Sequence, residues 1–202
     1  MAGLRAVVFD VGNVLYGWDI GCLYRKLIDD PARLAHILTR VITPEWHFQH
    51  DAGRPFAETS AELIARFPDH EELIRLYAPR WLETISGPVP GMLDLVEHLA
   101  ARGVPLYAIT NFSAEFWPRF RQTAPIFDLF EDIIVSGAEQ LVKPDPAIYR
   151  LALQRFNLAP GEALFIDDRT ENIRAGEANG FPGHLFSGAA RLRTRLEAEG
   201  LL

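Results

Sequence analysis

The chain has 202 residues, of which 49% are hydrophobic and 23% charged, which suits one domain with an insertion or two small domains. Its formal net charge of -7 argues against nucleic acid or an anionic membrane as the main partner, although a local positive site can still bind a phosphorylated small molecule. A single cysteine excludes a disulfide framework and a thiolate metal site, and no apolar run reaches the roughly 18 residues of a membrane span. Because the N-terminal apolar run is too short for a signal peptide, we expect a cytoplasmic protein.

The first predicted element is a strand over residues 6–9, the apolar run AVVF, which ends at Asp10. Its hydrophobicity is continuous rather than alternating, which indicates a strand buried on both faces of a parallel sheet. No further strand is predicted before Val104. Residues from about 16 to 87 show the pattern of several short helices, and the Gly- and Pro-rich stretch 86–91 is interpreted as a return linker. Because a βαβ crossover needs only about a dozen residues, this stretch is predicted to be a helical insertion over the end of the first strand.

Beyond the insertion, predicted strands and helices alternate. The later apolar runs are VPLYAIT ending at Thr110, EDIIVS ending at Ser136, EALFID ending at Asp167 and the weaker GHLFS ending at Ser187. Helical segments lie between them, and one of these has Asp145 as N-cap and Pro146 at its first position. This alternation is typical of a doubly wound α/β domain with a parallel sheet. We predict a Rossmann-like core domain made of residues 1–15 and 88–202, and a helical cap domain over residues 16–87.

Polar side chains follow the predicted strands where each strand ends. They are Asp10, Thr110 with Asn111, Ser136 with Lys143 soon after, and Asp167 with Asp168. Ligands of open α/β sheets bind beyond the carboxyl ends of the strands. Three acids, a lysine and small polar donors at one lidded edge therefore predict metal-assisted chemistry on an anionic group. Only two of the 20 basic residues are lysine, which favours a specific role for Lys143.

Four stretches at these strand ends form a known series of motifs: FDVGNVL, AITN, VKPDPAIY and FIDDRTEN. In this order they resemble the motifs of haloacid dehalogenase superfamily hydrolases with a small helical cap, and the resemblance covers nearly the whole chain. It implies an enzyme of the hydrolase class that uses Mg²⁺ as a cofactor and acts on a small-molecule substrate, a phosphate monoester in the phosphatases. For catalysis the resemblance implies Asp10 as the nucleophile and a role for Lys143, which also binds substrate together with Thr110 and Asn111. For the metal it implies Asp10, the carbonyl of Gly12 and Asp168 as direct ligands. Asp167 and Asn172 are weaker metal candidates.

Structural alternatives exist for several of these residues. Thr110 and Asn111 would also serve as ordinary helix caps, and Lys143 as a solvated loop lysine. Asp168 and Glu171 have the spacing of a capping box. Two adjacent acids at one strand end repel each other, however, unless a cation lies close by, and this favours the metal site.

The predicted cap has no sharp motif. His47 lies three residues before His50 in a predicted helix, and both are expected to be partly exposed, with contact to a leaving group as the less favoured alternative. HExxH, Walker A and GxGxxG patterns do not occur, so zinc peptidase, P-loop and dinucleotide-binding functions have no support.

Gly12 is a departure from the family pattern. In phosphatases of the superfamily the residue two after the nucleophile is usually a second aspartate, which protonates the leaving oxygen and later activates water. Three hypotheses follow. The first is a Mg²⁺-dependent phosphatase of a small phosphorylated metabolite, with an aspartyl-phosphate on Asp10 and with water or a cap residue in place of the acid. The second is a 2-haloacid dehalogenase, whose halide needs no proton but whose relatives lack the paired acids. The third is a non-catalytic binding protein. The substrate and the oligomeric state remain open.

Overall fold

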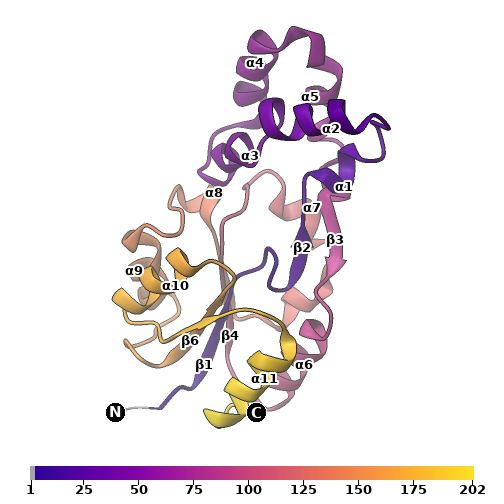
Figure 1. Cartoon of the computed structure of the whole chain (residues 1–202). Helices are drawn as coiled ribbons and strands as arrows, with labels where there is room; N and C mark the ends of the chain where they lie inside the picture. Colours follow the sequence, from indigo (N-terminus) through magenta and orange to yellow (C-terminus); the bar gives the residue numbers. More distant parts are fainter. Residues whose placement is uncertain (1–2) are drawn as a thin grey trace.

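The computed structural model describes residues 3–202, and its centre is a five-stranded sheet (Figure 1). All neighbouring strands are parallel. The sheet order is β5 (Asp132–Val135), β4 (Leu106–Thr110), β1 (Ala6–Phe9), β6 (Ala163–Asp167) and β7 (Gly183–Leu185). Val8 on β1 pairs with Tyr107 on one side and with Phe165 on the other. The central strand β1 therefore delivers Asp10 between the ends of β4 and β6.

Helices cover both faces of this sheet, as predicted for a doubly wound fold (Figure 1). The helices on one face are α9 (Pro146–Arg155) and α10 (Thr170–Ala178), and those on the other include α6 (Met92–Ala101) and α11 (Ala189–Ala198). Shorter segments complete the connections: α7 (Trp117–Arg121), η4 (Pro125–Leu129) and α8 (Ser136–Glu139). As predicted, Asp145 caps α9 by accepting a hydrogen bond from the backbone N–H of Ala147 at 2.7 Å.

Strand β1 is buried on both faces. Ala6 and Val8 belong to the apolar cluster that contains Ile148 and Ala152 of α9. Val7 and Phe9 belong to the cluster on the opposite face, and all four side chains of the strand are fully buried. This two-sided burial is the reason for the continuous hydrophobicity of the strand in the sequence.

The segment between β1 and α6 forms a helical layer beyond the carboxyl ends of the strands (Figure 1). Its elements are β2 (Tyr16–Trp18), α1 (Gly21–Tyr24), α2 (Pro31–His36), the π-helical η1 (Ile37–Val41), α3 (Pro44–Asp51), α4 (Phe56–Arg66), η2 (Pro68–His70), α5 (Glu71–Tyr77), η3 (Trp81–Thr84) and β3 (Ile85–Pro88). Apolar side chains of this layer join the cluster on the α6 face of the sheet, so one hydrophobic core continues from the sheet into the insertion. The helices of the insertion are therefore packed onto the sheet domain.

Two expectations about the insertion were wrong. Strands β2 and β3 pair antiparallel, with Tyr16 opposite Pro88, although no strand was predicted between Asp10 and Val104. The predicted linker at residues 86–91 likewise begins with the last three residues of β3. Strands of three or four residues are too short for a recognisable pattern, and Gly and Pro disfavour strand conformation. Pairing between segments about 70 residues apart therefore decides this element.

No helix among residues 3–202 has the length and hydrophobicity needed to cross a lipid bilayer. The cytoplasmic location stays a prediction.

Candidate active site

Asp10 follows β1 directly, and its carboxylate is held by two groups. Oδ1 lies 2.8 Å from Nζ of Lys143 and accepts a hydrogen bond from the backbone N–H of Val11 at 2.7 Å. Burial raises the pKa of Asp10 to about 7, although the charge of Lys143 acts in the opposite direction. The carboxyl group is thus desolvated and oriented, two conditions that favour its use as a nucleophile.

Lys143 is buried, with only 2% of its surface exposed, so the alternative of a solvated loop lysine is wrong. Its ammonium also lies 2.7 Å from Oδ2 of Asp167. Burial lowers the pKa of Lys143, but the two carboxylates outweigh this effect and leave the pKa raised. The side chain therefore stays charged and joins the ends of β1 and β6.

Asp167 and Asp168 have different surroundings. Asp167 is fully buried at the end of β6, and its carboxylate accepts hydrogen bonds from Lys143, from the Asn172 amide and from the backbone N–H of Arg169. Asp168 is half-buried and lines the adjacent cavity. Burial and then the charge of Asp167 raise the pKa of Asp168. The capping box, which was the structural alternative for Asp168 and Glu171, does not form, because α10 has Arg169 at its N-cap and Glu171 pairs with Arg169.

The carboxylates of Asp10, Asp167 and Asp168 offer oxygens within 4.8 Å of one another. Lys143 supplies one positive charge to this group of three acids. Carboxylate oxygens are preferred ligands of Mg²⁺, which would balance the two remaining negative charges. The residues therefore fit a divalent cation, and of these three acids Asp10 and Asp168 line the open cavity.

Thr110 and Asn111 lie at the end of β4, beside Asp10. The Thr110 hydroxyl is buried and has no hydrogen-bond partner within the described chain, residues 3–202. The Asn111 amide instead forms two hydrogen bonds with the Lys143 backbone, donating to its carbonyl at 3.0 Å and accepting from its N–H at 2.8 Å. Asn111 thus positions the loop that carries Lys143, while Thr110 offers a free hydroxyl, so the substrate-binding role expected for both stays a prediction.

Gly12 has room for a side chain. A Cβ atom built on it would meet no atom within 4 Å, and its backbone does not have a positive φ. Neither local crowding nor backbone conformation therefore requires glycine at this position.

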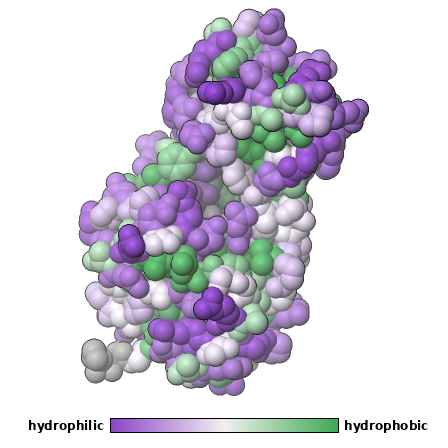
Figure 2. Space-filling view, in the orientation of Figure 1, coloured by the Kyte–Doolittle hydropathy of each residue, from purple (hydrophilic) through white to green (hydrophobic). Residues whose placement is uncertain are grey.

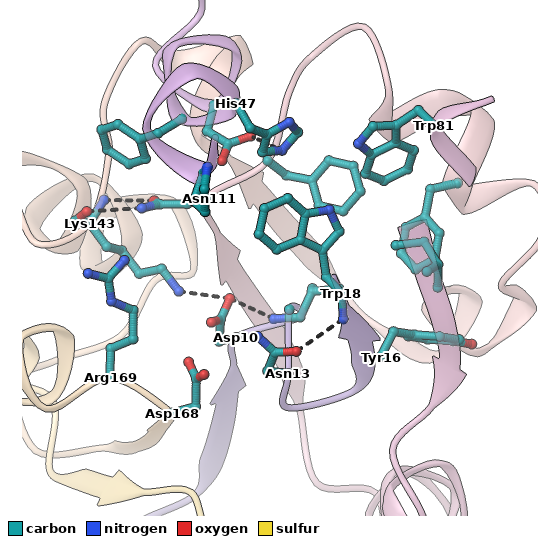
Figure 3. A pocket seen from close by; sticks show the side chains of 18 of the residues that line it. Asp10, Asn13, Tyr16, Trp18, His47, Trp81, Asn111, Lys143, Asp168 and Arg169 are labelled. Carbon is teal, nitrogen blue, oxygen red and sulfur yellow. Dashed lines mark hydrogen bonds and ion pairs between the residues drawn. The ribbon is translucent and has the colours of Figure 1, made fainter. Parts of the chain in front are cut away.

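A cavity of about 480 Å³ opens above Asp10, between the sheet and the inserted helices. Figure 2 shows a hollow between these two parts of the molecule. Figure 3 shows Asp10, Lys143 and Asp168 on the floor of the cavity, with Trp18, His47 and Trp81 on the opposite side. The remaining apolar wall comes from the side chains of Val11, Tyr16, Pro44, Phe48, Ile85, Phe112 and Phe120. The wall is thus largely aromatic, whereas the floor is charged.

Two histidines of α3 are buried, contrary to expectation. His47 is 5% exposed and His50 is 1% exposed. Nδ1 of His47 lies 2.7 Å from the Tyr77 hydroxyl, and Nε2 of His50 lies 2.6 Å from the Thr59 hydroxyl. The error has a physical cause, because α3 packs against α4 and the sheet domain on several sides, so its sequence has no single polar face.

Sequence analysis also missed Asp51, the last residue of α3. Asp51 is 7% exposed and lines the cavity, and its Oδ1 lies 3.4 Å from Nε2 of His47. The i, i+4 spacing of these two residues was the only available signal, and it is common on solvent-exposed helices.

Comparisons with known proteins agree with this geometry. Residues 4–180 match the family model for haloacid dehalogenase-like hydrolases. The chain belongs to this family. A member of the haloacid dehalogenase-like hydrolases is an enzyme of the hydrolase class, and the four motifs and the sheet topology of this chain agree with that assignment.

The curated relatives of this family member include phosphatases. Over 198 residues the chain is 27% identical to the sesquiterpene phosphatase AstK of Aspergillus oryzae, and this match covers 92% of each protein. It is 34% identical over 134 residues to phosphoglycolate phosphatase of Yersinia pseudotuberculosis, a match that spans 66% of this chain and 55% of that protein. The function is therefore that of a phosphatase-type hydrolase.

Solved structures show the same fold. The family enzyme BT-2542 of Bacteroides thetaiotaomicron, in its magnesium complex, has a TM-score of 0.72 at 19% identity and covers 93% of this chain and 96% of its own. A dehalogenase superimposes with a TM-score of 0.68 at 19% identity, over 91% of this chain and 84% of its own. The same fold thus occurs in a magnesium-bound family enzyme and in a dehalogenase, so the fold alone does not distinguish the two candidate functions.

Proposed function

We propose that the protein is a Mg²⁺-dependent phosphatase that transfers the phosphoryl group of a phosphate monoester first to Asp10 and then to water. The observation that carries this proposal is the position of Asp10. Its buried carboxylate follows the central strand β1, contacts Lys143 and lies beside the Asp167–Asp168 pair. Dehalogenases of the superfamily lack such a pair, which favours the phosphatase over the dehalogenase.

Each residue of the site has a role in this mechanism. Asp10 attacks phosphorus, and Lys143 orients its carboxylate and neutralises charge on the phosphoryl oxygens. The unpaired Thr110 hydroxyl donates a hydrogen bond to one of these oxygens. Asp10, Asp168 and the Gly12 carbonyl would hold Mg²⁺, while Asp167 keeps Lys143 and the Arg169 loop in place. When bound, Mg²⁺ stabilises the negative charge of the transferred group.

The cavity wall supports a substrate whose organic part is apolar. Within the part of the chain that the structure describes, the cations that line the cavity are Lys143 and Arg169, and Arg169 is paired with Glu171. The insertion contributes aromatic side chains together with the ionised Glu45, so a second anionic group would meet repulsion there. The name of the Aspergillus oryzae relative, a sesquiterpene phosphatase, supports the same substrate class.

A substrate panel tests this function. Phosphate and halide release are assayed with farnesyl monophosphate, phosphoglycolate and 2-chloropropionate, in Mg²⁺ and in EDTA. We expect phosphate release that requires Mg²⁺, with kcat/KM for the prenyl substrate about 10-fold or more above that for phosphoglycolate. Asp10→Asn should abolish activity, whereas Asp128→Asn, at an exposed surface ion pair, should retain it. Halide release that persists in EDTA would identify a dehalogenase, and no turnover on either assay would identify a binding protein.

A further inference from the structure

The proposed phosphatase needs a proton donor that position 12 does not supply. An alkyl or prenyl alcohol leaves as a strongly basic oxygen, and general acid catalysis typically contributes about 10²- to 10⁴-fold to such a step. Gly12 has space for a carboxylate but carries none. The donor must therefore come from another side of the cavity.

Several cavity residues are unsuited to this task. Glu45 is exposed, and hydrogen bonds with its own backbone N–H and with Thr43 lower its pKa, so it is ionised. The Tyr16 hydroxyl points away from Asp10 in Figure 3. Burial lowers the pKa of His47 to about 3, which leaves its imidazole neutral.

The remaining groups already have other tasks. Lys143 contacts two carboxylates, and Arg169 is paired with Glu171. Asp168 belongs to the acid group that fits Mg²⁺. Among the titratable residues that line the cavity in the described chain, this leaves Asp51.

Asp51 has the surroundings of a carboxyl group that keeps its proton. It is buried at the cavity wall, and Oδ1 forms no hydrogen bond with any residue of the described range, 3–202. Oδ1 lies 3.4 Å from Nε2 of the neutral His47 imidazole, and Nδ1 of that ring contacts the Tyr77 hydroxyl. Burial and the negative charge of Asp10 raise the pKa of Asp51 well above the usual range of an aspartate. A neutral carboxyl group at this place can donate a proton.

The sheet domain holds Asp51 in position, although Asp51 belongs to the insertion. The Ser136 hydroxyl donates a hydrogen bond to the Asp51 carbonyl at 2.6 Å and accepts one from the Phe112 N–H at 2.9 Å. Gly137 allows a close approach, because a Cβ there would lie 3.1 Å from the His50 carbonyl oxygen. The end of α3 is thus fixed to the start of α8 and to the loop after β4, which is the preorganisation that proton transfer requires.

We propose that Asp51 is the general acid and base of the reaction, in place of the aspartate that is absent at position 12. This role rests on the proposed phosphatase function. In the first step the Asp10 oxygen bonds to phosphorus, the bond from phosphorus to the leaving oxygen breaks, and the Asp51 proton moves to that oxygen to give the alcohol. In the second step water bonds to phosphorus, the bond to Asp10 breaks, and a proton of the water returns to Asp51. Inorganic phosphate leaves, and both carboxyl groups regain their starting states. His47 acts as a positioning residue for Asp51.

The dependence on the leaving group tests this proposal. Wild type and Asp51→Asn are compared on farnesyl monophosphate, whose alcohol needs a proton, and on p-nitrophenyl phosphate, whose phenolate leaves without one. We expect kcat/KM for the first substrate to fall about 10²-fold or more and for the second to fall less than about 10-fold. Asp128→Asn, a change of an exposed acid in a surface ion pair outside the cavity, is the control and should leave the ratio of the two substrates unchanged. In Asp51→Asn the second step becomes slow, so p-nitrophenol should appear as a burst of one equivalent per enzyme.

A second variant tests whether an aspartate at position 12 restores the activity that Asp51→Asn loses. Gly12→Asp combined with Asp51→Asn should recover at least about 10-fold of the lost prenyl activity if the two positions supply the same proton. Equal losses on both substrates without rescue would overturn the role of Asp51 and indicate a structural one, and so would full activity of Asp51→Asn. If Asp51→Asn does not fold, as judged by circular dichroism, the ratio is measured with Asp51→Ser, which also removes the carboxyl group, and an unchanged ratio would likewise overturn the proposal. These outcomes require that the wild type releases phosphate. If the wild type releases none, the phosphatase function itself is rejected, and not only the role of Asp51.

Discussion

Lys143 shows how much one buried side chain can determine. Its ammonium contacts Asp10 and Asp167 at 2.8 and 2.7 Å, so a single positive charge compensates acids at the ends of two strands. The other lysine of the chain, Lys26, forms a half-exposed ion pair with Glu83 at 3.0 Å. Removal of one partner from a buried pair leaves an uncompensated charge, whereas an exposed pair contributes little.

We predict that Lys143→Met lowers the free energy of unfolding by about 3–5 kcal/mol at pH 7.5 in EDTA, against less than about 1 kcal/mol for Lys26→Met. The pKa of Asp10 is raised from 3.8 to about 7 in the folded protein, so proton uptake by Asp10 favours the folded state and this contribution is lost as pH rises through 7. The cost of Lys143→Met should therefore shrink at pH 5. Urea unfolding at both pH values measures it, and a cost that does not depend on pH would contradict the prediction.

At the scale of elements, the contact between α3 and the strand ends decides what the insertion contributes to the site. The backbone approaches so closely at Gly137 that a Cβ would lie 2.6 Å from the Ala114 nitrogen and 2.9 Å from the Phe112 oxygen. These are backbone atoms and cannot rotate away. A side chain at position 137 must therefore push the start of α8 away from the loop after β4, and it would also crowd the His50 carbonyl oxygen of α3 at 3.1 Å.

We expect Gly137→Ala to lower the free energy of unfolding by about 1–3 kcal/mol, the usual cost of overpacking. It should also reduce kcat on the prenyl substrate, because Asp51 moves with the end of α3. Gly3→Ala, at an exposed position with open space around it, is the matched control and should change neither quantity. Thermal unfolding and steady-state kinetics check both effects. A stable variant with full kcat would show that the α3 contact is dispensable.

At the scale of the whole molecule, the charged groups of the site come from strand ends that are far apart in the sequence. Asp10 and Asp168 are separated by more than 150 residues, yet both belong to the acid group that fits Mg²⁺. Only the folded chain brings the two carboxylates close enough to bind one ion together. Its binding free energy is therefore added to the stability of the fold.

Mg²⁺ should raise the melting temperature, with a gain of about 2.7 kcal/mol at a concentration 100 times the dissociation constant. Asp168→Asn should abolish most of this shift. Glu171→Gln, an exposed acid three residues further along the chain, should retain it, because Glu171 pairs with Arg169 outside the acid group. Differential scanning fluorimetry with Mg²⁺ and with EDTA measures the shift. Equal shifts in both variants would place the ion elsewhere.

The sequence by itself determined the sheet and the identity of its polar edge. The runs at β1, β4, β5 and β6 are continuously apolar because helices cover both faces, and each ends in the polar residue that the fold requires there. Asp10, Lys143 and the Asp167–Asp168 pair were predicted for this reason, since strand ends are local features and parallel strands end at one edge. The order in which the five strands pair was not predicted and comes from the structure.

Only the tertiary structure decided the pairing of β2 with β3, the burial of His47 and His50, and the position of Asp51. Each depends on contacts between segments distant in sequence: β2 is too short to show a pattern, and α3 is buried by neighbours that its own periodicity does not record. Asp51 is an ordinary acid in the sequence. It lines the active-site cavity because Ser136 and Gly137 of the sheet domain fix the end of α3, and that constraint exists only once the chain has folded.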